Sequence, residues 1–215
     1  MIRFLRAHPF SIMALCNIVG DLCYVGFAFD AEGFVSTPKF LGASFTMVAH
    51  LLLLAYGDNQ AQAVATESGK LSRVFFGLRD GAQGLTRRLP DDLQIMLRAK
   101  PVGIPFAMLS LNGGAFFVDG WIRMAHGAPV AMFDQMVMGI LISMGTGLFA
   151  IADFTRSQTT ANFLTKAAPS ILGCASIANF ILAFTTLNPF IIISCVAFAL
   201  SNAAGLFTHI DKKVL

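Results

Sequence analysis

Residues 9–56 read PFSIMALCNIVGDLCYVGFAFDAEGFVSTPKFLGASFTMVAHLLLLAY, two apolar runs joined by a short acidic loop. The runs cover about 9–29 and 40–56, and the loop between them carries Asp30 and Glu32. A membrane-spanning helix needs about 20 mostly apolar residues. The stretch therefore predicts two antiparallel transmembrane helices that form a helical hairpin.

The rest of the chain has the same apolar character. Of its 215 residues, 56% are hydrophobic and only 13% are charged, and the mean hydropathy is +0.70. Soluble domains carry about 25% charged residues. We expect six transmembrane helices, at about 9–29, 40–56, 101–120, 130–154, 167–186 and 190–208. The composition thus predicts an all-α polytopic membrane protein with a single membrane domain, 1–215, and leaves no room for a folded soluble domain.

Lysine and arginine are unevenly divided between the predicted loops. With six spans, 13 of the 15 basic residues fall on the side of the two termini, and only Lys39 and Arg123 fall on the other. Basic residues accumulate in cytoplasmic loops. We therefore expect both termini in the cytoplasm and a multi-pass protein of a bacterial inner membrane.

The one long polar segment, 57–100, combines basic and apolar residues. Its stretch Leu89-Pro90-Asp91-Asp92 is typical of a helix start, because proline suits the first turn and acids complement the helix dipole. The segment predicts short amphipathic helices on the inner leaflet. It is either an ordinary basic loop or a docking surface for a protein partner or anionic lipid. The basic residues of such a surface are Arg73, Arg79, Arg87, Arg88, Arg98 and Lys100.

The six apolar runs show a repeated layout. Each odd-numbered run begins with a basic residue followed closely by proline, and has an asparagine near its middle. Each even-numbered run has a small or polar residue about eight positions before its polar end. The layout predicts three parallel copies of one helical hairpin, as internal repeats are common in transporters. The alternative is that membrane composition and the placement of basic residues converge on this pattern.

Asp21 is the strongest candidate for a functional residue. It lies ~18 Å along its helix from Pro9 at 1.5 Å per residue, near the middle of the membrane, where an ionisable group is costly and usually functional. The same rise places Asn17 and His50 at nearly equal depth in the antiparallel hairpin. An Asp–His pair could relay protons or bind a cation, since histidine titrates near neutral pH. The alternative is that hydrogen bonds among the three residues only join the helices.

Asparagines in the later runs extend this candidate site. The complete set of substrate or proton-site residues is Asp21, His50, Asn17, Asn112, Asn179 and Asn202. Asn112 precedes Gly113 and Gly114, which predict either a break in the helix beside a cavity or close packing against a neighbouring helix. Amide side chains between helices are also common as structural hydrogen bonds.

Several familiar chemical motifs do not occur in the sequence. It contains no phosphate-binding G-x-x-x-x-G-K-[ST], no zinc-binding H-E-x-x-H and no G-x-S-x-G nucleophile motif. The four cysteines lie in apolar runs without metal-ligand spacing, and we interpret them as packing residues. We expect no catalytic residues, no metal site, no cofactor and no nucleic-acid partner.

Three functional classes follow from these features. The first is a small-solute or proton-coupled transporter with a site between the first three spans. The second is a non-catalytic membrane subunit or assembly factor that docks into a larger complex through 57–100. The third, an intramembrane enzyme acting on lipid or quinone, is the least favoured. We favour transport because a buried ionisable pair and an internal repeat occur together.

Overall fold

The chain is described by a computed structural model that covers residues 2–32, 37–58, 70–126 and 131–210. All regular structure in these residues is α-helical, with no strand among them, which confirms the all-α prediction. The helices are α1 (Ile2–Ala7), α2 (Pro9–Glu32), α3 (Thr37–Tyr56), α4 (Lys70–Thr86), α5 (Asp91–Ala99), α6 (Gly103–Ala125), α7 (Ala131–Phe154), α8 (Gln158–Thr186) and α9 (Pro189–Gly205). Each predicted apolar run falls largely within one of the long helices α2, α3, α6, α7, α8 and α9.

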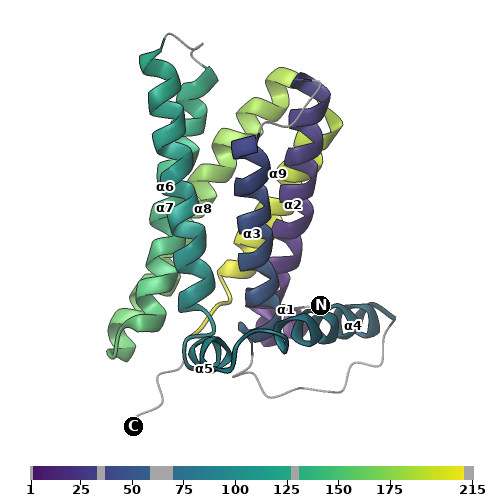
Figure 1. Ribbon diagram of the computed structural model, residues 1–215, viewed down its shortest axis with the longest axis vertical. Helices are drawn as coiled ribbons and strands as arrows, with labels where there is room; N and C mark the ends of the chain where they lie inside the picture. Colours follow the sequence, from purple (N-terminus) through teal and green to yellow (C-terminus); the bar gives the residue numbers. More distant parts are fainter. Residues whose placement is uncertain (1, 33–36, 59–69, 127–130, 211–215) are drawn as a thin grey trace.

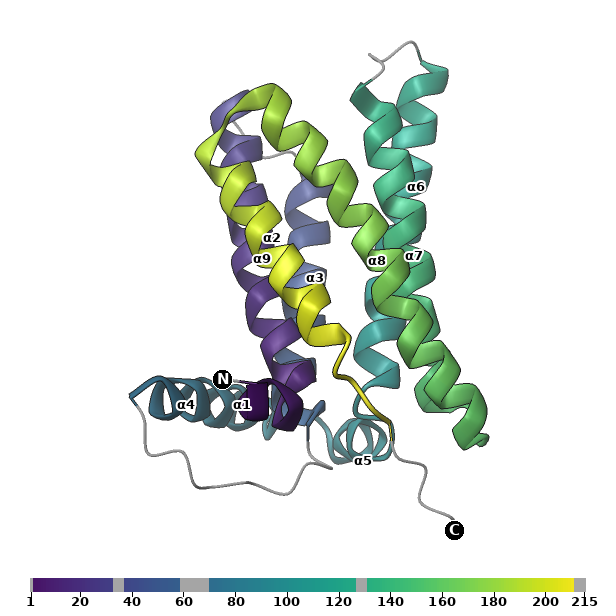
Figure 2. The same ribbon diagram turned by 180° about the vertical axis from the view of Figure 1, so that it is seen from behind.

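These long helices run along the long axis of the molecule, and α1, α4 and α5 lie across one end (Figure 1). We call this the α4–α5 end. α6 packs on α7, α2 packs on both α3 and α9, and α8 joins the two groups through contacts with α7 and α9. The view from behind shows α8 slanting across the bundle (Figure 2). The first and last long helices of the chain, α2 and α9, are therefore neighbours.

Within the described residues, two helices are long and apolar enough to cross a membrane, over Met136–Phe154 and Gln158–Thr185. A third crossing follows if α5 and α6, which meet at a bend of 93°, count as one span. The described apolar parts of α2, α3 and α9 are shorter, at Pro9–Cys23, Leu41–Tyr56 and Pro189–Gly205. The helices are thus compatible with a membrane protein of two or three crossings, and six crossings require the shorter helices to span as well.

Helix α8 begins earlier than the sequence suggests. The polar residues 155–166 predict a loop, but α8 starts directly after Ser157 and continues through Pro169. Ser157 begins the helix, because its hydroxyl oxygen accepts a hydrogen bond from Thr160 N at 3.2 Å. A Cβ atom added to Gly205 of α9 would lie 3.2 Å from Pro169 Cγ. Close packing on this glycine accommodates a proline inside α8, where helix propensity alone predicts a boundary.

Helices α6 and α7 approach each other at two glycines. A Cβ atom added to Gly113 would lie 2.6 Å from Ser143 N, and one added to Gly139 would lie 2.6 Å from Phe117 N. Ser110 Oγ also donates a hydrogen bond to Ser143 O at 2.8 Å across this crossing. Helix α6 is continuous here. Gly113 therefore serves close packing, and the alternative of a break in this helix is wrong.

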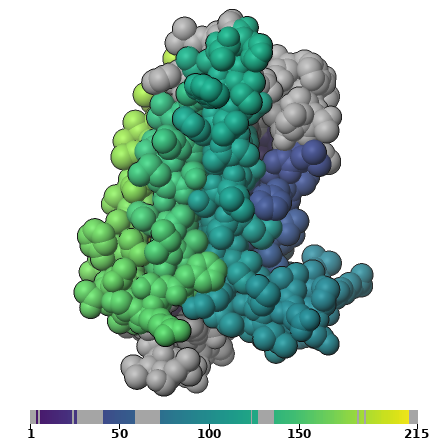
Figure 3. All heavy atoms as spheres, turned by 60° about the vertical axis from the view of Figure 1, so that its left-hand side comes forward, coloured from purple at the N-terminus to yellow at the C-terminus, as the bar shows by residue number. Residues whose placement is uncertain are grey.

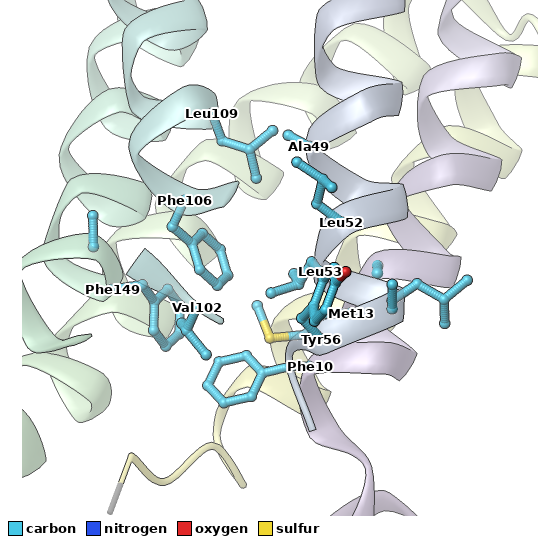
Figure 4. Packing of buried hydrophobic residues seen from close by; sticks show 14 of the residues in the cluster. Phe10, Met13, Ala49, Leu52, Leu53, Tyr56, Val102, Phe106, Leu109 and Phe149 are labelled. Atoms are coloured by element: carbon cyan, nitrogen blue, oxygen red, sulfur yellow. The ribbon is translucent and has the colours of Figure 1, made fainter. Parts of the chain in front are cut away.

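Aromatic side chains close the bundle near its α4–α5 end (Figure 4). Phe10 of α2 packs against Phe106 of α6 and Phe149 of α7, with ring centroids 6.2 and 6.0 Å apart. Phe106 and Phe149 stack on each other at 4.5 Å. All three rings are buried, and Met13 and Leu53 belong to the surrounding core. We call Phe10, Phe106 and Phe149 the aromatic barrier.

Two buried carboxylates hold the first turns of α2 and α6. Asp58, which follows α3, accepts hydrogen bonds from the amides of the two residues after Pro9, at 3.1 and 2.7 Å. Asp153, near the end of α7, accepts them from the amides of the two residues after Pro101, at 3.1 and 2.6 Å. Amides in a first helical turn have no partner within the helix, and a carboxylate there also complements the helix dipole. Each carboxylate thus ties the start of one helix to the end of its neighbour.

Removing either carboxylate is expected to destabilise the fold. In Asp58→Ala and Asp153→Ala, two buried amides lose their partners, which costs about 1–3 kcal/mol in each variant. We expect a lower unfolding temperature in detergent, measured by circular dichroism. The control is Asp80→Ala, which removes an exposed carboxylate of α4 and should leave the unfolding temperature unchanged. A cap variant as stable as this control would contradict the capping role.

His8 holds α4 against the start of the chain. Its ring is buried, and the ring centroid lies 5.3 Å from that of Phe75 and 5.5 Å from that of Phe76, both on α4. The ring centroid of Phe4 on α1 lies 5.3 Å away. Burial lowers the pKa of His8 below its ordinary value of 6.5, and the positive charge of Arg79 lowers it further. The folded protein therefore favours a neutral His8.

Acidification is expected to weaken this contact. Between pH 6.5 and the lowered pKa of His8, the unfolded chain binds a proton that the folded chain does not. The stabilisation is fully present above pH 6.5 and is lost as the pH falls through the folded pKa. The unfolding temperature should therefore fall less on acidification in His8→Phe than in wild type. His126→Phe alters an exposed ring and should keep the wild-type dependence; equal curves for all three proteins would refute the prediction.

Candidate functional site

A cavity of about 150 Å³ lies between the long helices, and Phe106 of the aromatic barrier lines it. It is bounded by α2, α3, α6, α7, α8 and α9. All six residues that the sequence predicts as a substrate or proton site line it, namely Asn17, Asp21, His50, Asn112, Asn179 and Asn202. We call this space the polar cavity. It extends beyond the first three long helices, because α8 and α9 supply two of the asparagines.

Asn17, His50 and Asp21 form a chain of contacts on the wall of the polar cavity. Asn17 Nδ2 donates a hydrogen bond to His50 Nε2 at 3.1 Å. On the other edge of the ring, His50 Nδ1 lies 3.0 Å from Asp21 Oδ2. Because an amide NH₂ group only donates, this arrangement corresponds to a neutral imidazole with its proton on Nδ1, facing Asp21. The three residues meet as their depths in the hairpin predict.

The contact between Asp21 and His50 is close but is not a well-directed hydrogen bond. Neither Asp21 Oδ2 nor His50 Nδ1 has a hydrogen-bond partner within the described part of the chain. The His50 side chain is 4% exposed and that of Asp21 is 18% exposed. Buried charges are costly unless they are paired and hydrogen-bonded. Both atoms are therefore shielded from solvent without a well-aligned hydrogen bond between them.

The charge of the polar cavity depends on a single proton. Among the described residues that line it, Asp21 and His50 are the only ones with ionisable side chains, and no lysine or arginine occurs. With His50 neutral, the lining carries the negative charge of Asp21. With His50 protonated, the two charges cancel.

The three other asparagines have different surroundings. Asn202 Nδ2 donates hydrogen bonds to Leu172 O at 3.0 Å and to Ser176 Oγ at 2.6 Å, so it joins α9 to α8. Asn112 points from α6 toward α3. Asn179 is only 3% exposed, and its Oδ1 accepts no hydrogen bond from any described residue. A buried acceptor without a partner costs about 1–3 kcal/mol, so it marks a place for a donor from a ligand or water.

Most of the remaining lining is apolar. It includes the rings of Phe106, Phe116 and Phe198 and the side chains of Met13 and Met138. In the residues that the structure describes, no group of three or more His, Cys, Asp or Glu side chains is placed to hold a metal ion. An apolar wall with a few convergent polar groups is typical of a site for a small molecule.

A second cavity, of about 180 Å³, lies on the other side of the aromatic barrier, and we call it the end cavity. Both capping carboxylates, Asp58 and Asp153, line it together with Arg6. Phe10 also lines the end cavity and packs on Phe106, which lines the polar cavity. Burial raises the pKa of the Asp58 carboxyl, against the effect of the hydrogen bonds that it accepts. Phe10 and Phe106, one ring from each lining, thus pack against each other between the two cavities.

The end cavity and the capping roles of Asp58 and Asp153 were not predicted from the sequence. The available signal was the aspartate at the polar end of the second and fourth apolar runs. To predict that these aspartates cap a neighbouring helix, one would have to know that the ends of the two runs lie beside Pro9 and Pro101. That proximity follows only when both helices of a hairpin are placed at equal height.

The basic residues of the predicted docking segment have different surroundings. Lys100 Nζ donates a hydrogen bond to Asp153 O at 2.8 Å and lies 5.7 Å from the ring centre of Phe154. Its side chain therefore contacts the end of α7. Arg79 is partly buried beside His8. The exposed ones are Arg73, Arg87, Arg88 and Arg98. In the space-filling view, α4 and α5 project sideways from the long helices (Figure 3).

Comparison of the chain with protein-family models, with curated proteins and with solved structures finds no match. No relative therefore suggests a substrate or a partner.

Proposed function

We propose that this chain is a six-span inner-membrane protein that carries a small solute across the membrane, coupled to a proton bound at Asp21 and His50. The polar cavity is the observation that supports this most. Five helices direct polar candidate residues into one space in the interior of the bundle. A solute site requires a few polar side chains to converge on one space.

The proposal includes three repeated hairpins with both termini in the cytoplasm. Asp58 and Asp153 stand in the same relation to Pro9 and Pro101, because each carboxylate caps the two residues after its proline. This match supports a common origin for the first two hairpins. The third differs, since α8 continues through its proline, and Asp211, its expected counterpart, lies outside the described residues.

The aromatic barrier supports transport rather than simple binding. Alternating access needs a solute site that is closed toward one side of the membrane by a barrier that can rearrange. Phe10 and Phe106 provide such a closure, with the polar cavity on one side and the end cavity on the other. The barrier is apolar, and its rings come from three different helices, so a shift between those helices would open it.

Transport is tested with the full chain in liposomes that contain a pH-sensitive dye. A panel of small cationic, neutral and anionic solutes is added outside, and the change of internal pH is recorded against protein-free liposomes. We expect at least one solute to drive a proton flux that falls at least tenfold in Asp21→Asn. Asp80→Asn, on the exposed surface of α4, is the control and should match wild type. Fluxes at the protein-free level for the whole panel, or equal in wild type and Asp21→Asn, would overturn the proposal.

A second candidate function is that of a non-catalytic membrane subunit that docks through α4 and α5. It is favoured by large apolar side chains exposed beside the exposed arginines, namely Val74, Leu78, Leu85, Ile95 and Met96. Cross-linking in native membranes would then trap one defined partner. Replacing Arg87 and Arg88 by glutamate should abolish that product, whereas Asp21→Asn should preserve it. The opposite pattern would leave transport as the better explanation.

A further inference from the structure

We propose that the polar cavity binds a small organic monocation, a protonated amine, and that this cation exchanges with a proton on His50. The inference rests on the proposed transport function and specifies both its solute class and its direction of coupling. It starts from the charge that the cavity lining carries and from the acceptors that the lining leaves without partners.

Charge is the first argument. With His50 neutral, Asp21 is the only charged group in the described lining of the polar cavity. A buried charge is costly until it is neutralised. An anion would be repelled by Asp21, and a neutral solute would leave it uncompensated. A monocation neutralises it, so the lining selects one positive charge.

Hydrogen bonding and shape are the second argument. An ammonium group has three donors and no acceptor, and Asp21 Oδ2 and Asn179 Oδ1 are acceptors that no described residue satisfies. The rings of Phe116 and Phe198 offer an apolar wall and favourable contacts with a cation. A cavity of about 150 Å³ accommodates a ligand about as large as benzene. A small amine with a compact hydrocarbon body matches all three features, whereas a bare metal ion would leave the apolar wall unused.

Proton exchange follows from the pair itself. In the solute-free, protonated state, the imidazolium of His50 lies beside the Asp21 carboxylate. When the ammonium group takes that place, His50 releases one proton to water and becomes neutral, so the net charge of the cavity is unchanged. Asn17 adapts by turning its amide, since Oδ1 accepts from a protonated Nε2 and Nδ2 donates to a neutral one. The described lining residues of α6, α7, α8 and α9 contribute no other ionisable side chain.

Isothermal titration calorimetry of the full chain in detergent tests this site directly. The probes are cyclohexylamine, its neutral counterpart cyclohexanol, and cyclohexanecarboxylate. We expect cyclohexylamine to bind at least tenfold more tightly than the other two. Titrations in buffers with different heats of ionisation should show up to about one proton released per amine bound, and the affinity should rise with pH until His50 is neutral.

Variants separate the two parts of the proposal. Asp21→Asn should weaken amine binding at least tenfold, and Asp21→Glu, which keeps the charge, should retain part of it. His50→Gln should bind amine without releasing a proton. Asp80→Asn should behave as wild type. Circular dichroism and gel filtration identify any variant that fails to fold, and the wild-type comparison of the three probes decides the solute class without any variant.

Several results would overturn the inference. Cyclohexanol or cyclohexanecarboxylate binding as tightly as the amine would exclude a cation site, as would the absence of amine binding. Amine binding without proton release in wild type would exclude exchange with His50. The proposed transport function fails separately. Amine binding with proton release but no flux in liposomes would refute transport and support the amine site. A proton flux driven only by neutral solutes would support transport and refute the amine site.

Discussion

Gly113→Ala is expected to separate α6 from α7 and to lower the unfolding temperature of the protein markedly. The added Cβ atom would lie 2.6 Å from Ser143 N and 2.9 Å from Gly139 O, both backbone atoms. A side chain can turn away from a clash, but a helix backbone must move as a whole. Overpacking of this kind costs about 1–3 kcal/mol or more, and we expect the upper part of that range.

The neighbouring glycine provides a matched control. A Cβ atom on Gly114 meets only Ser143 Oγ, at 3.8 Å, which is ordinary contact. Gly114→Ala should therefore be neutral or should stabilise α6, since alanine is the better helix former by about 1 kcal/mol. Thermal unfolding in detergent, followed by circular dichroism, measures both variants. Equal unfolding temperatures for Gly113→Ala and Gly114→Ala would refute the close crossing.

Gly139→Ala should resemble Gly113→Ala, because its Cβ atom would lie 2.6 Å from Phe117 N across the same crossing. The double variant should then lose less stability than the sum of the two single losses. Once one alanine has separated the helices, the second meets a gap that is already open. Additive losses would mean that the two glycines act at independent contacts.

The convergence of the polar residues was predictable because depth along a helix is fixed by its rise. Asn17 and His50 lie on the two antiparallel helices of one hairpin. Counting residues from the ends of these helices places them at nearly equal depth in the membrane. Their side chains do meet, at 3.1 Å. Asn112 and Asn179 reach the same cavity for a related reason, since each lies near the middle of an apolar run.

Which helices become neighbours was not predictable in the same way. Ser194 Oγ of α9 donates a hydrogen bond to Gly20 O of α2 at 3.0 Å, and these residues lie 174 positions apart. An apolar helix with small residues on several faces can pack through any of them, so composition does not select a partner. The extension of α8 through Pro169 was missed for the same reason. Pro169 packs against a glycine of α9, a helix that follows later in the chain.

Phe106→Ala is expected to have the largest combined effect on stability and function. Its ring is 1% exposed and stacks on Phe149 at 4.5 Å, between the polar cavity and the end cavity. Truncating a buried phenylalanine costs about 3–5 kcal/mol, because the surroundings refill the space only in part. The variant should also join the two cavities, so that liposomes containing it leak protons without any added solute. Thermal unfolding and the decay of a pH gradient measure the two effects.

Phe184→Ala is the control for both measurements, because that ring on α8 is 77% exposed and touches neither cavity. It should unfold near the wild-type temperature and hold a pH gradient as well as wild type.

The leak and the loss of stability have separate meanings in Phe106→Ala. A variant that is destabilised but holds the gradient would show that the aromatic barrier is only a packed core. A leak that persists when Asp21→Asn is added would show that water passes the opened barrier without the Asp21–His50 pair. A leak abolished by that second change would show that protons reach the barrier through the pair, as proton-coupled transport requires.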